Sequence, residues 1–275
     1  MKIRPAIRLT AIIGVALIFL TPLWWVTISA FRPESDIFAH MFPINWEFMF
    51  PRVLSFDNFV QLTQSDFSRA IFNSCLVAAL TIVIGLLICA SGAFALAVID
   101  FPYRNAVFAL VVVGFLIPFD AIALPLFEIL RGYNLQNTYT GLVLPGVGSG
   151  LAVFMLRQFF LGIPKELREA AMIDGMSWFQ IFWRVYLPLS PHALVGAAMI
   201  LFVFQWHAYL WPLLIAPAPD HKVASVAIAQ FSTTFETRYG LMFAGAFIMA
   251  AIPMMLLLLS QRYLRPSVSS SGGKE

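Results

Sequence analysis

Charged residues are scarce in this chain. Lys, Arg, Asp and Glu make up 11% of its 275 residues, and 60% of the residues are hydrophobic. In a typical soluble domain about a quarter of the residues are charged, so this composition excludes an ordinary soluble protein. The net charge of +3 arises without any cluster of Lys or Arg, so a nucleic-acid partner is not expected. We therefore expect an integral membrane protein.

Catalytic and metal-binding patterns are also missing. The four histidines follow no H-x-x-x-H or H-E-x-x-H spacing, and no G-x-x-x-x-G-K-[ST] loop that could cradle a nucleotide phosphate occurs. The two cysteines, Cys75 and Cys89, lie too far apart along one predicted helix to form a disulfide. We predict no catalytic residue, no metal and no cofactor on this chain, which excludes ATP hydrolysis by the chain alone.

Long hydrophobic runs, in contrast, are abundant. Stretches long enough to cross about 30 Å of hydrocarbon occur at residues 9–31, 70–99, 106–130, 139–160, 193–216 and 241–261. The first stretch is too long for a signal-peptide core and no A-x-A site follows it, so we expect it to be a retained span. The predicted fold is an all-α integral membrane protein with six transmembrane helices. They form one domain over residues 1–264, followed by a flexible cytoplasmic tail at 265–275.

Positive charge is distributed unequally between the two sides of these spans. Eleven of the 17 Lys and Arg residues fall in the termini and alternate loops, and six fall on the other side. Because the richer side is normally cytoplasmic, both termini are expected in the cytoplasm. The loop at residues 161–191, between the fourth and fifth spans, lies on the same side.

The loop at 161–191 is the longest charged interruption among the spans. Pro164 and Glu166 favour the start of a short helix that continues to about Ile173, and Gly175 suits a left-handed turn after it. One face of this helix carries mostly small side chains and is nearly smooth, so it could fit into a groove of a partner protein. The alternative is a solvated loop whose charges only keep it out of the bilayer.

A second short helix is predicted in the same loop. Ser177 and Gln180 have the spacing of a capping box, which marks the start of the helix. The helix ends before Pro188. Ser190 and Pro191 are expected to be the cap and the first residue of the next span.

The order of residues in this loop is distinctive. It contains Glu169-Ala170-Ala171, Asp174-Gly175, Phe182, Val185, Leu187-Pro188 and Pro191. This pattern resembles the EAA loop of ABC importer permeases in its carbohydrate-uptake form. Other stretches similar to that family are Asn73-Ser74, Gly92 to Ala97, Leu135 to Tyr139, Trp211 to Leu213 and Gln261 to Tyr263. The resemblance covers about residues 9–264 and is to the smaller, six-span subunit of maltose- and glycerol-phosphate-type importers.

The resemblance implies a permease subunit in a bacterial cytoplasmic membrane, surrounded by lipid. Its implied partners are a homologous permease, two ATPase subunits that bind ATP and Mg, and an extracytoplasmic substrate-binding protein. The loop would be a cytoplasmic coupling helix that contacts the ATPase through Glu169, Ala170, Ala171, Asp174, Gly175, Leu187 and Pro188. A neutral sugar, a polyol and an anionic sugar or glycerol ester are all possible solutes. The chain departs from the family in its Ser-rich tail and at Trp206-His207, where relatives often have Trp-Asn.

Polar side chains inside the predicted spans are the remaining candidates for a site. Such groups are costly when they face lipid and therefore usually face a cavity or a partner. Asp120, Gln205, Trp206, His207 and Tyr209 are predicted to line the translocation path, because aromatic faces stack on sugars while amide and imidazole groups bond to hydroxyls. Equally open is a structural role, in which Asp120 bonds a neighbouring helix and the aromatic residues belong to an interfacial belt.

The same residues allow two other functions. A proton-coupled secondary transporter could use Asp120, Glu128 and His207 as a relay, although Glu128 could instead lie at the membrane interface beside Arg131. A membrane-embedded hydrolase could use Asp120, but no second carboxylate for a dyad is evident. The six spans show no visible inverted repeat, which argues against the secondary transporter.

Overall fold

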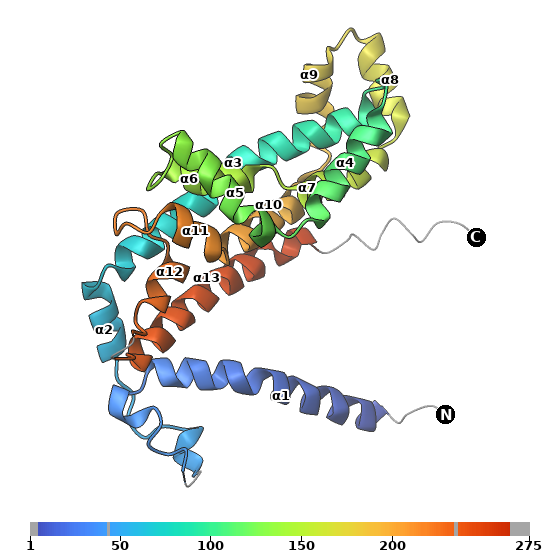
Figure 1. Ribbon diagram of the computed structural model, residues 1–275. Helices are drawn as coiled ribbons and strands as arrows, with labels where there is room; N and C mark the ends of the chain where they lie inside the picture. Colours follow the sequence, from blue (N-terminus) through green and yellow to red (C-terminus); the bar gives the residue numbers. More distant parts are fainter. Residues whose placement is uncertain (1–4, 43–44, 234–235, 265–275) are drawn as a thin grey trace. The chain divides into compact units, whose positions relative to one another are not determined.

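The computed structural model describes residues 5–42, 45–233 and 236–264, and every regular element in this described part is a helix (Figure 1). The all-α prediction is therefore confirmed. Two compact units are present, Met1–Ile71 with Ala224–Ile252 and Phe72–Val223 with Pro253–Glu275. The predicted tail at 265–275 lies outside the described residues. A single domain over 1–264 stays a prediction.

The first unit is built from apolar helices joined by short turns. Its elements are α1 (Pro5–Ala30), η1 (Glu34–Asp36), η2 (Trp46–Phe48), α2 (Asp57–Gln64), the start of α3 (Phe67–Val98), α12 (Ala224–Ala229) and most of α13 (Tyr239–Leu264). Small residues dominate its core: Ala30, Leu62, Phe67, Ala70, Ala224, Ala227, Leu241 and Ala244. Small side chains allow close helix approach, as is usual in membrane proteins.

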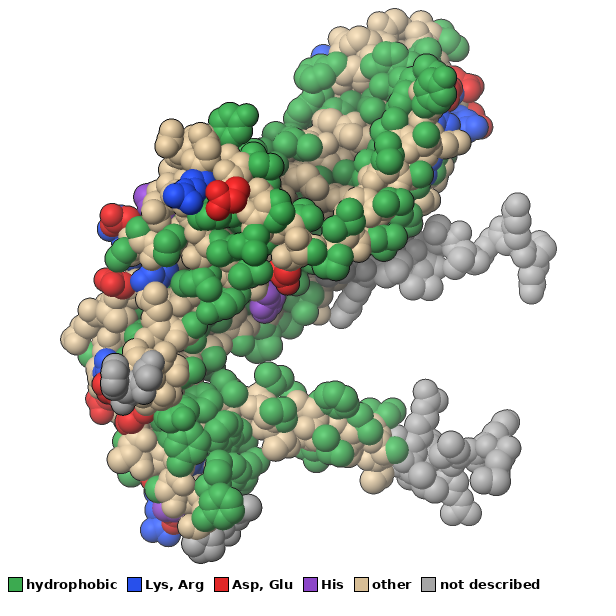
Figure 2. Space-filling model, viewed as in Figure 1, with side chains coloured by type: hydrophobic (Ala, Val, Ile, Leu, Met, Phe, Trp, Pro, Cys, Tyr) green, Lys and Arg blue, Asp and Glu red, His purple; other side chains and the backbone are tan. Residues whose placement is uncertain are grey.

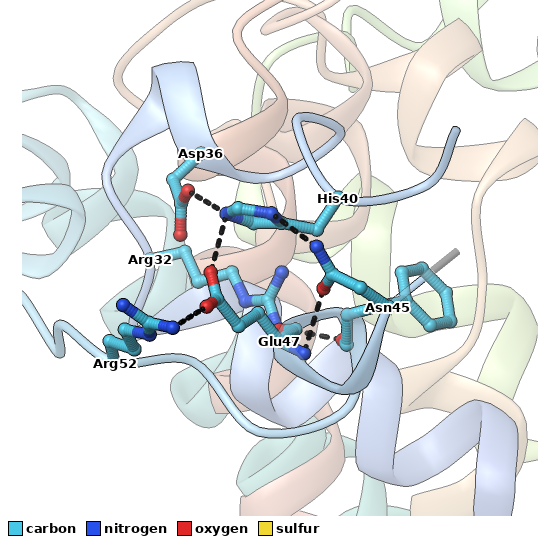
Figure 3. Close-up of polar contacts among 7 residues, drawn as sticks. Arg32, Asp36, His40, Asn45, Glu47 and Arg52 are labelled. Atoms are coloured by element: carbon cyan, nitrogen blue, oxygen red, sulfur yellow. Dashed lines mark hydrogen bonds and ion pairs between the residues drawn. The ribbon is translucent and has the colours of Figure 1, made fainter. Parts of the chain in front are cut away.

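A cluster of polar side chains lies in the segment after α1 and stabilises the turns of that segment (Figure 3). The fully buried Arg32 donates a hydrogen bond of 2.6 Å from Nη2 to the backbone carbonyl of Glu47. Burial lowers the pKa of Arg32, and the negative charge of Asp36 opposes that shift. His40 Nε2 lies 3.0 Å from Asp36 and 3.3 Å from Glu47, whose other oxygen lies 2.5 Å from Arg52. These contacts hold η2 against the end of α1.

The second unit contains the remaining helices. They are the rest of α3, α4 (Arg104–Leu116), α5 (Phe119–Gly132), α6 (Tyr139–Val143), η3 (Leu144–Val147), α7 (Gly150–Leu161), α8 (Lys165–Ile173), α9 (Trp178–Ile181), the π-helical turn η4 (Phe182–Tyr186), α10 (Pro191–Trp206) and α11 (Leu210–Ile215). Figure 1 shows α8 and α9 at the end of this unit opposite α6. Arg157 and Arg168 bond the carbonyls of Leu96 and Val98, at the α8 end of α3.

The number of helices that could cross a membrane agrees with the six predicted spans. Three described helices, α1, α3 and α13, are long and apolar enough to cross a bilayer alone, and up to six spans result if each bent helix pair counts as one. Hydrophobic side chains are spread over the face in Figure 2, and charged side chains form small groups. A surface of this kind suits lipid and helical partners.

Three predicted spans are nevertheless not continuous helices. In the stretch 106–130, α4 and α5 meet at 98°. Pro118 causes this break, because it offers no backbone N–H and Ile117 before it is extended, with ψ 122°. The stretch 139–160 bends by 43° between η3 and α7, and 193–216 is interrupted between α10 and α11. Each of these stretches is therefore built from more than one helix.

Candidate functional site

A cavity of about 930 Å³ lies in the second unit, where the helix breaks converge. Its walls come from the α4–α5, η3–α7 and α10–α11 junctions, with Thr81 added from α3. A broken helix leaves backbone N–H and C=O groups without helical partners, and such groups are tolerated at membrane depth only beside a cavity or buried in protein. The polar side chains of the lining are Thr81, Asp120, Ser149, Gln205, His207 and Tyr209. The cavity therefore combines an apolar wall with hydrogen-bonding groups.

The residues predicted for the translocation path divide between two places. Four of the five line the cavity, namely Asp120, Gln205, His207 and Tyr209. Trp206 does not: it is 2% exposed, and its ring stacks on Phe202 with centroids 5.3 Å apart. Successive residues of a helix point about 100° apart, so Gln205 can face the cavity while Trp206 packs behind it. Consecutive polar and aromatic residues in a helix therefore cannot all face the same cavity.

Gly146 leaves room for the Gln205 amide. A Cβ atom at Gly146 would lie 2.7 Å from Gln205 Oε1 and 3.0 Å from Thr81. Thr81 Oγ1 donates a hydrogen bond of 3.4 Å to the same Gln205 oxygen. Sequence reasoning missed Gly146, because its role depends on a contact between residues far apart in the chain.

The charge of the cavity comes from a single group. Among its 24 lining residues, all of them described, Asp120 is the only Asp or Glu, and there is no Lys or Arg. Glu128 does not line the cavity; its side chain is 67% exposed and lies 3.9 Å from Arg131. The interfacial position considered for Glu128 fits this geometry, and a relay through Asp120, Glu128 and His207 does not.

Two of the stretches that resemble the permease family, Leu135 to Tyr139 and Trp211 to Leu213, lie at the α6 end of the second unit. Asn137 accepts a hydrogen bond of 3.0 Å from the backbone N–H of Ala218. Trp211 donates from Nε1 to the carbonyl of Gly141 at 3.1 Å. Both bonds join segments that are distant in sequence, so these motif residues hold the ends of α6 and α11 together beside the cavity.

The loop at 161–191 contains the two predicted short helices, α8 and α9. Between them Gly175 has φ 75°, the left-handed conformation expected of it. Ser177 and Gln180 form the predicted capping box. Ser190 and Pro191 are the N-cap and the first residue of α10, as predicted, but the Ser190 hydroxyl forms no capping bond and donates to the carbonyl of Tyr186 at 2.6 Å.

The predicted coupling residues point in two directions. Ala171 is 5% exposed and packs in the core of the second unit, and Leu187 packs against the same core. The others are exposed, namely Glu169, Ala170, Asp174, Gly175 and Pro188. Glu169 lies 3.7 Å from Arg168, which donates to the carbonyl of Val98 at the end of α3. The loop is thus anchored on its inner side and available on its outer side.

Aromatic rings make that anchor rigid. Phe94 of α3 contacts Phe182 and Tyr186 of η4, with centroids 5.3 Å and 5.0 Å apart. Phe160 of α7 contacts Tyr186 edge-on at 5.6 Å. Tilted and edge-on ring pairs of this kind add to the stabilisation from burial. Sequence analysis did not find this cluster, because the rings come from three separate segments.

The outer side of the loop is unusually apolar for a segment outside the spans. Ile173 is 86% exposed and Phe179 is 72% exposed, with Leu167, Met172 and Trp178 also exposed near them. Contiguous exposed apolar groups indicate an interaction surface rather than a solvated loop. Apolar and aromatic side chains next to Glu169 and Asp174 fit a protein partner.

Comparisons with known proteins agree with this arrangement. Residues 90–270 match the family described as "Binding-protein-dependent transport system inner membrane component". The arabinooligosaccharides transport system permease protein AraQ of Halalkalibacterium halodurans is 33% identical over 94% of this chain and 93% of its own. The sn-glycerol-3-phosphate transport system permease protein UgpE of Yersinia pestis is 33% identical over 92% and 91%. A chain of a bacterial ABC transporter that imports the acidic polysaccharide alginate has the same fold, with a TM-score of 0.80, 17% identity and coverage of 96% and 100%.

Proposed function

The chain belongs to the family of binding-protein-dependent transport system inner membrane components, and we propose that it forms half of the pathway of an ABC importer for a sugar or sugar-like solute. It is a permease subunit and a multi-pass inner-membrane protein. The permease prediction is thereby confirmed. Relatives named for arabinooligosaccharides and sn-glycerol-3-phosphate support the solute class.

The other half of the pathway comes from a homologous permease. In the chain alone Asp120, His207 and Tyr209 are exposed although they line the cavity. A second permease that packs over these residues would close the cavity and separate it from lipid. An extracytoplasmic binding protein would deliver the solute, and two ATPase subunits would bind ATP and Mg.

We place the loop at 161–191 and both termini in the cytoplasm. The larger share of Lys and Arg on that side supports this orientation. About 37 Å of helix rise separates Asn73 from Val98 along α3, and the loop bonds to the Val98 end. This separation is enough to put α6 and α8 on opposite sides of a bilayer.

Coupling to ATP works through the same loop. The outer residues Glu169, Ala170, Asp174, Gly175 and Pro188 contact an ATPase, while Ala171 and Leu187 hold the loop on the spans. When ATP closes the ATPase pair, the loop moves with it and changes the packing of the spans around the cavity. The observation that carries this proposal is the contrast between the ring-packed inner side of the loop and its exposed apolar outer side.

The cavity at the helix breaks is the translocation path. Asp120, Gln205, His207 and Tyr209 offer hydrogen bonds to hydroxyl groups there. The proton-coupled alternative has no support, because Glu128 lies outside the cavity and pairs with Arg131.

The test is co-purification of the tagged chain from its native membrane in mild detergent, followed by mass spectrometry and an ATPase assay. We expect a second permease and a nucleotide-binding subunit in the eluate, with ATPase activity. A chain recovered alone, and taking up solute with a proton gradient in the absence of ATP, would contradict the proposal.

A further inference from the structure

The electrostatics of the cavity distinguish among the solutes that the relatives' names suggest. Asp120 is the only carboxyl group of its lining, and Lys and Arg are absent from that lining. Within the described residues, Asp120 forms no hydrogen bond or ion pair, and it sits in the first turn of α5 beside the Pro118 break. Its carboxylate is therefore free to bind a solute.

A negative solute would meet this carboxylate without a compensating cation from this chain. Proteins recognise phosphate and carboxylate groups chiefly with Arg and Lys, whose charged hydrogen bonds offset the loss of hydration. Two like charges repel more strongly as they approach, so Asp120 would repel a negative group bound beside it. The lining thus disfavours phosphorylated sugars and uronic acids.

The same lining suits an uncharged sugar. An ionised carboxylate can accept hydrogen bonds from two hydroxyl groups at once, and Gln205 and His207 can each donate or accept one. Phe119 and Trp211 form an edge-on pair at 5.8 Å in the wall, and Tyr209 is exposed beside it. Aromatic faces of this kind cover the apolar face of a sugar ring.

We infer that this chain selects an uncharged sugar over an anionic one, with Asp120 as the solute-binding residue that accepts its hydroxyl groups and repels negative charge. The inference rests on the proposed importer function. It applies to the solute in the membrane pathway, after the binding protein has delivered it.

The test uses the complete importer with its binding protein in proteoliposomes supplied with ATP. The probes are arabinotriose and lactose, which are uncharged, and sn-glycerol 3-phosphate and an alginate trisaccharide, which are anionic. We expect ATP-dependent uptake of an uncharged probe only. Asp120→Asn should lower that uptake at least about tenfold, the loss expected for one hydrogen bond to a charged group, and Asp120→Glu should restore part of it.

Glu128→Gln is the matched control, because it removes a carboxylate from the same helix outside the cavity. Its uptake should equal that of the unmodified importer. ATP-dependent uptake of either anionic probe, or full uptake of the uncharged probe by Asp120→Asn, would overturn the inference and leave the importer function intact. Failure of all four probes, together with the absence of a co-purified ATPase, would overturn both.

Discussion

The phenol of Tyr139 donates a hydrogen bond of 2.8 Å to the side-chain oxygen of Asn73. The amide nitrogen of this fully buried Asn73 in turn donates to the backbone carbonyls of Asp220 and Lys222, at 3.0 Å and 2.9 Å. One amide thereby joins α3, α6 and the segment after α11. Buried polar groups that are fully paired fix a single arrangement of the chain.

Removing this amide should destabilise the second unit. Asn73→Leu removes one donor from each of the carbonyls of Asp220 and Lys222, at a cost of about 1–3 kcal/mol each, whereas Tyr139→Phe should cost only about 1 kcal/mol. Thermal unfolding of the purified protein in detergent measures the difference. Asn105→Leu, at an exposed position on α4, is the control. Equal melting temperatures for Asn73→Leu and the control would show that the network contributes no stability.

Substitution of Gly175 should disable coupling. The residue has φ 75°, a conformation that costs a residue with a Cβ about 1–2 kcal/mol. Gly175→Asp should abolish uptake while the protein still reaches the membrane, because the turn would be strained and the new charge would lie on the surface proposed to meet the ATPase. Gly132→Ala is the control, since a Cβ there meets nothing within 4 Å. Solute uptake and the amount of the protein in the membrane are measured on the same cells. Normal uptake by Gly175→Asp would refute the coupling role.

Reversing the charge of Glu169 should weaken attachment of the ATPase. Glu169 is exposed on the outer side of α8 and is proposed to meet a basic residue of the partner. Glu169→Lys should therefore reduce the amount of ATPase that co-purifies in detergent. Glu166→Lys makes the same charge change on the same helix and serves as the comparison. Unchanged co-purification for Glu169→Lys would remove the proposed ion pair.

Truncation of Phe94 should uncouple ATP hydrolysis from uptake. Phe94 is 4% exposed and contacts both Phe182 and Tyr186, so Phe94→Ala opens a cavity between α3 and the loop at a cost of about 3 kcal/mol. We expect the ATPase to remain bound and active while uptake falls. Phe72→Ala, at an exposed position on α3, should keep both activities. Parallel loss of ATPase binding and uptake would instead indicate general unfolding.

Local signals in the sequence predicted the loop at 161–191 well. Proline, glycine and a capping box affect the backbone only within a few residues, so the sequence alone predicts the bounds of α8, the Ser177–Gln180 capping box and the positive φ of Gly175. The composition likewise predicted helical, membrane-crossing segments.

Hydropathy could not reveal where the spans break. An apolar run such as 106–130 has the same composition whether it is straight or bent, and Pro118 alone does not determine an angle of 98°. The close contact of Gly146 with Gln205 and the burial of Trp206 depend on neighbours from other helices. These tertiary contacts determine which polar residues share the cavity.

The continuity of α3 has a mechanical consequence. Thr81 in the cavity wall and Phe94 at the loop belong to one helix, about 20 Å apart along its axis, and no proline lies between them. An α-helix of this length behaves as a stiff strut, so a push at its loop end tilts the whole strut. If an ATPase moves the loop as proposed, the displacement should reach the cavity wall at Thr81 through this one helix, without a relay of rotamer changes.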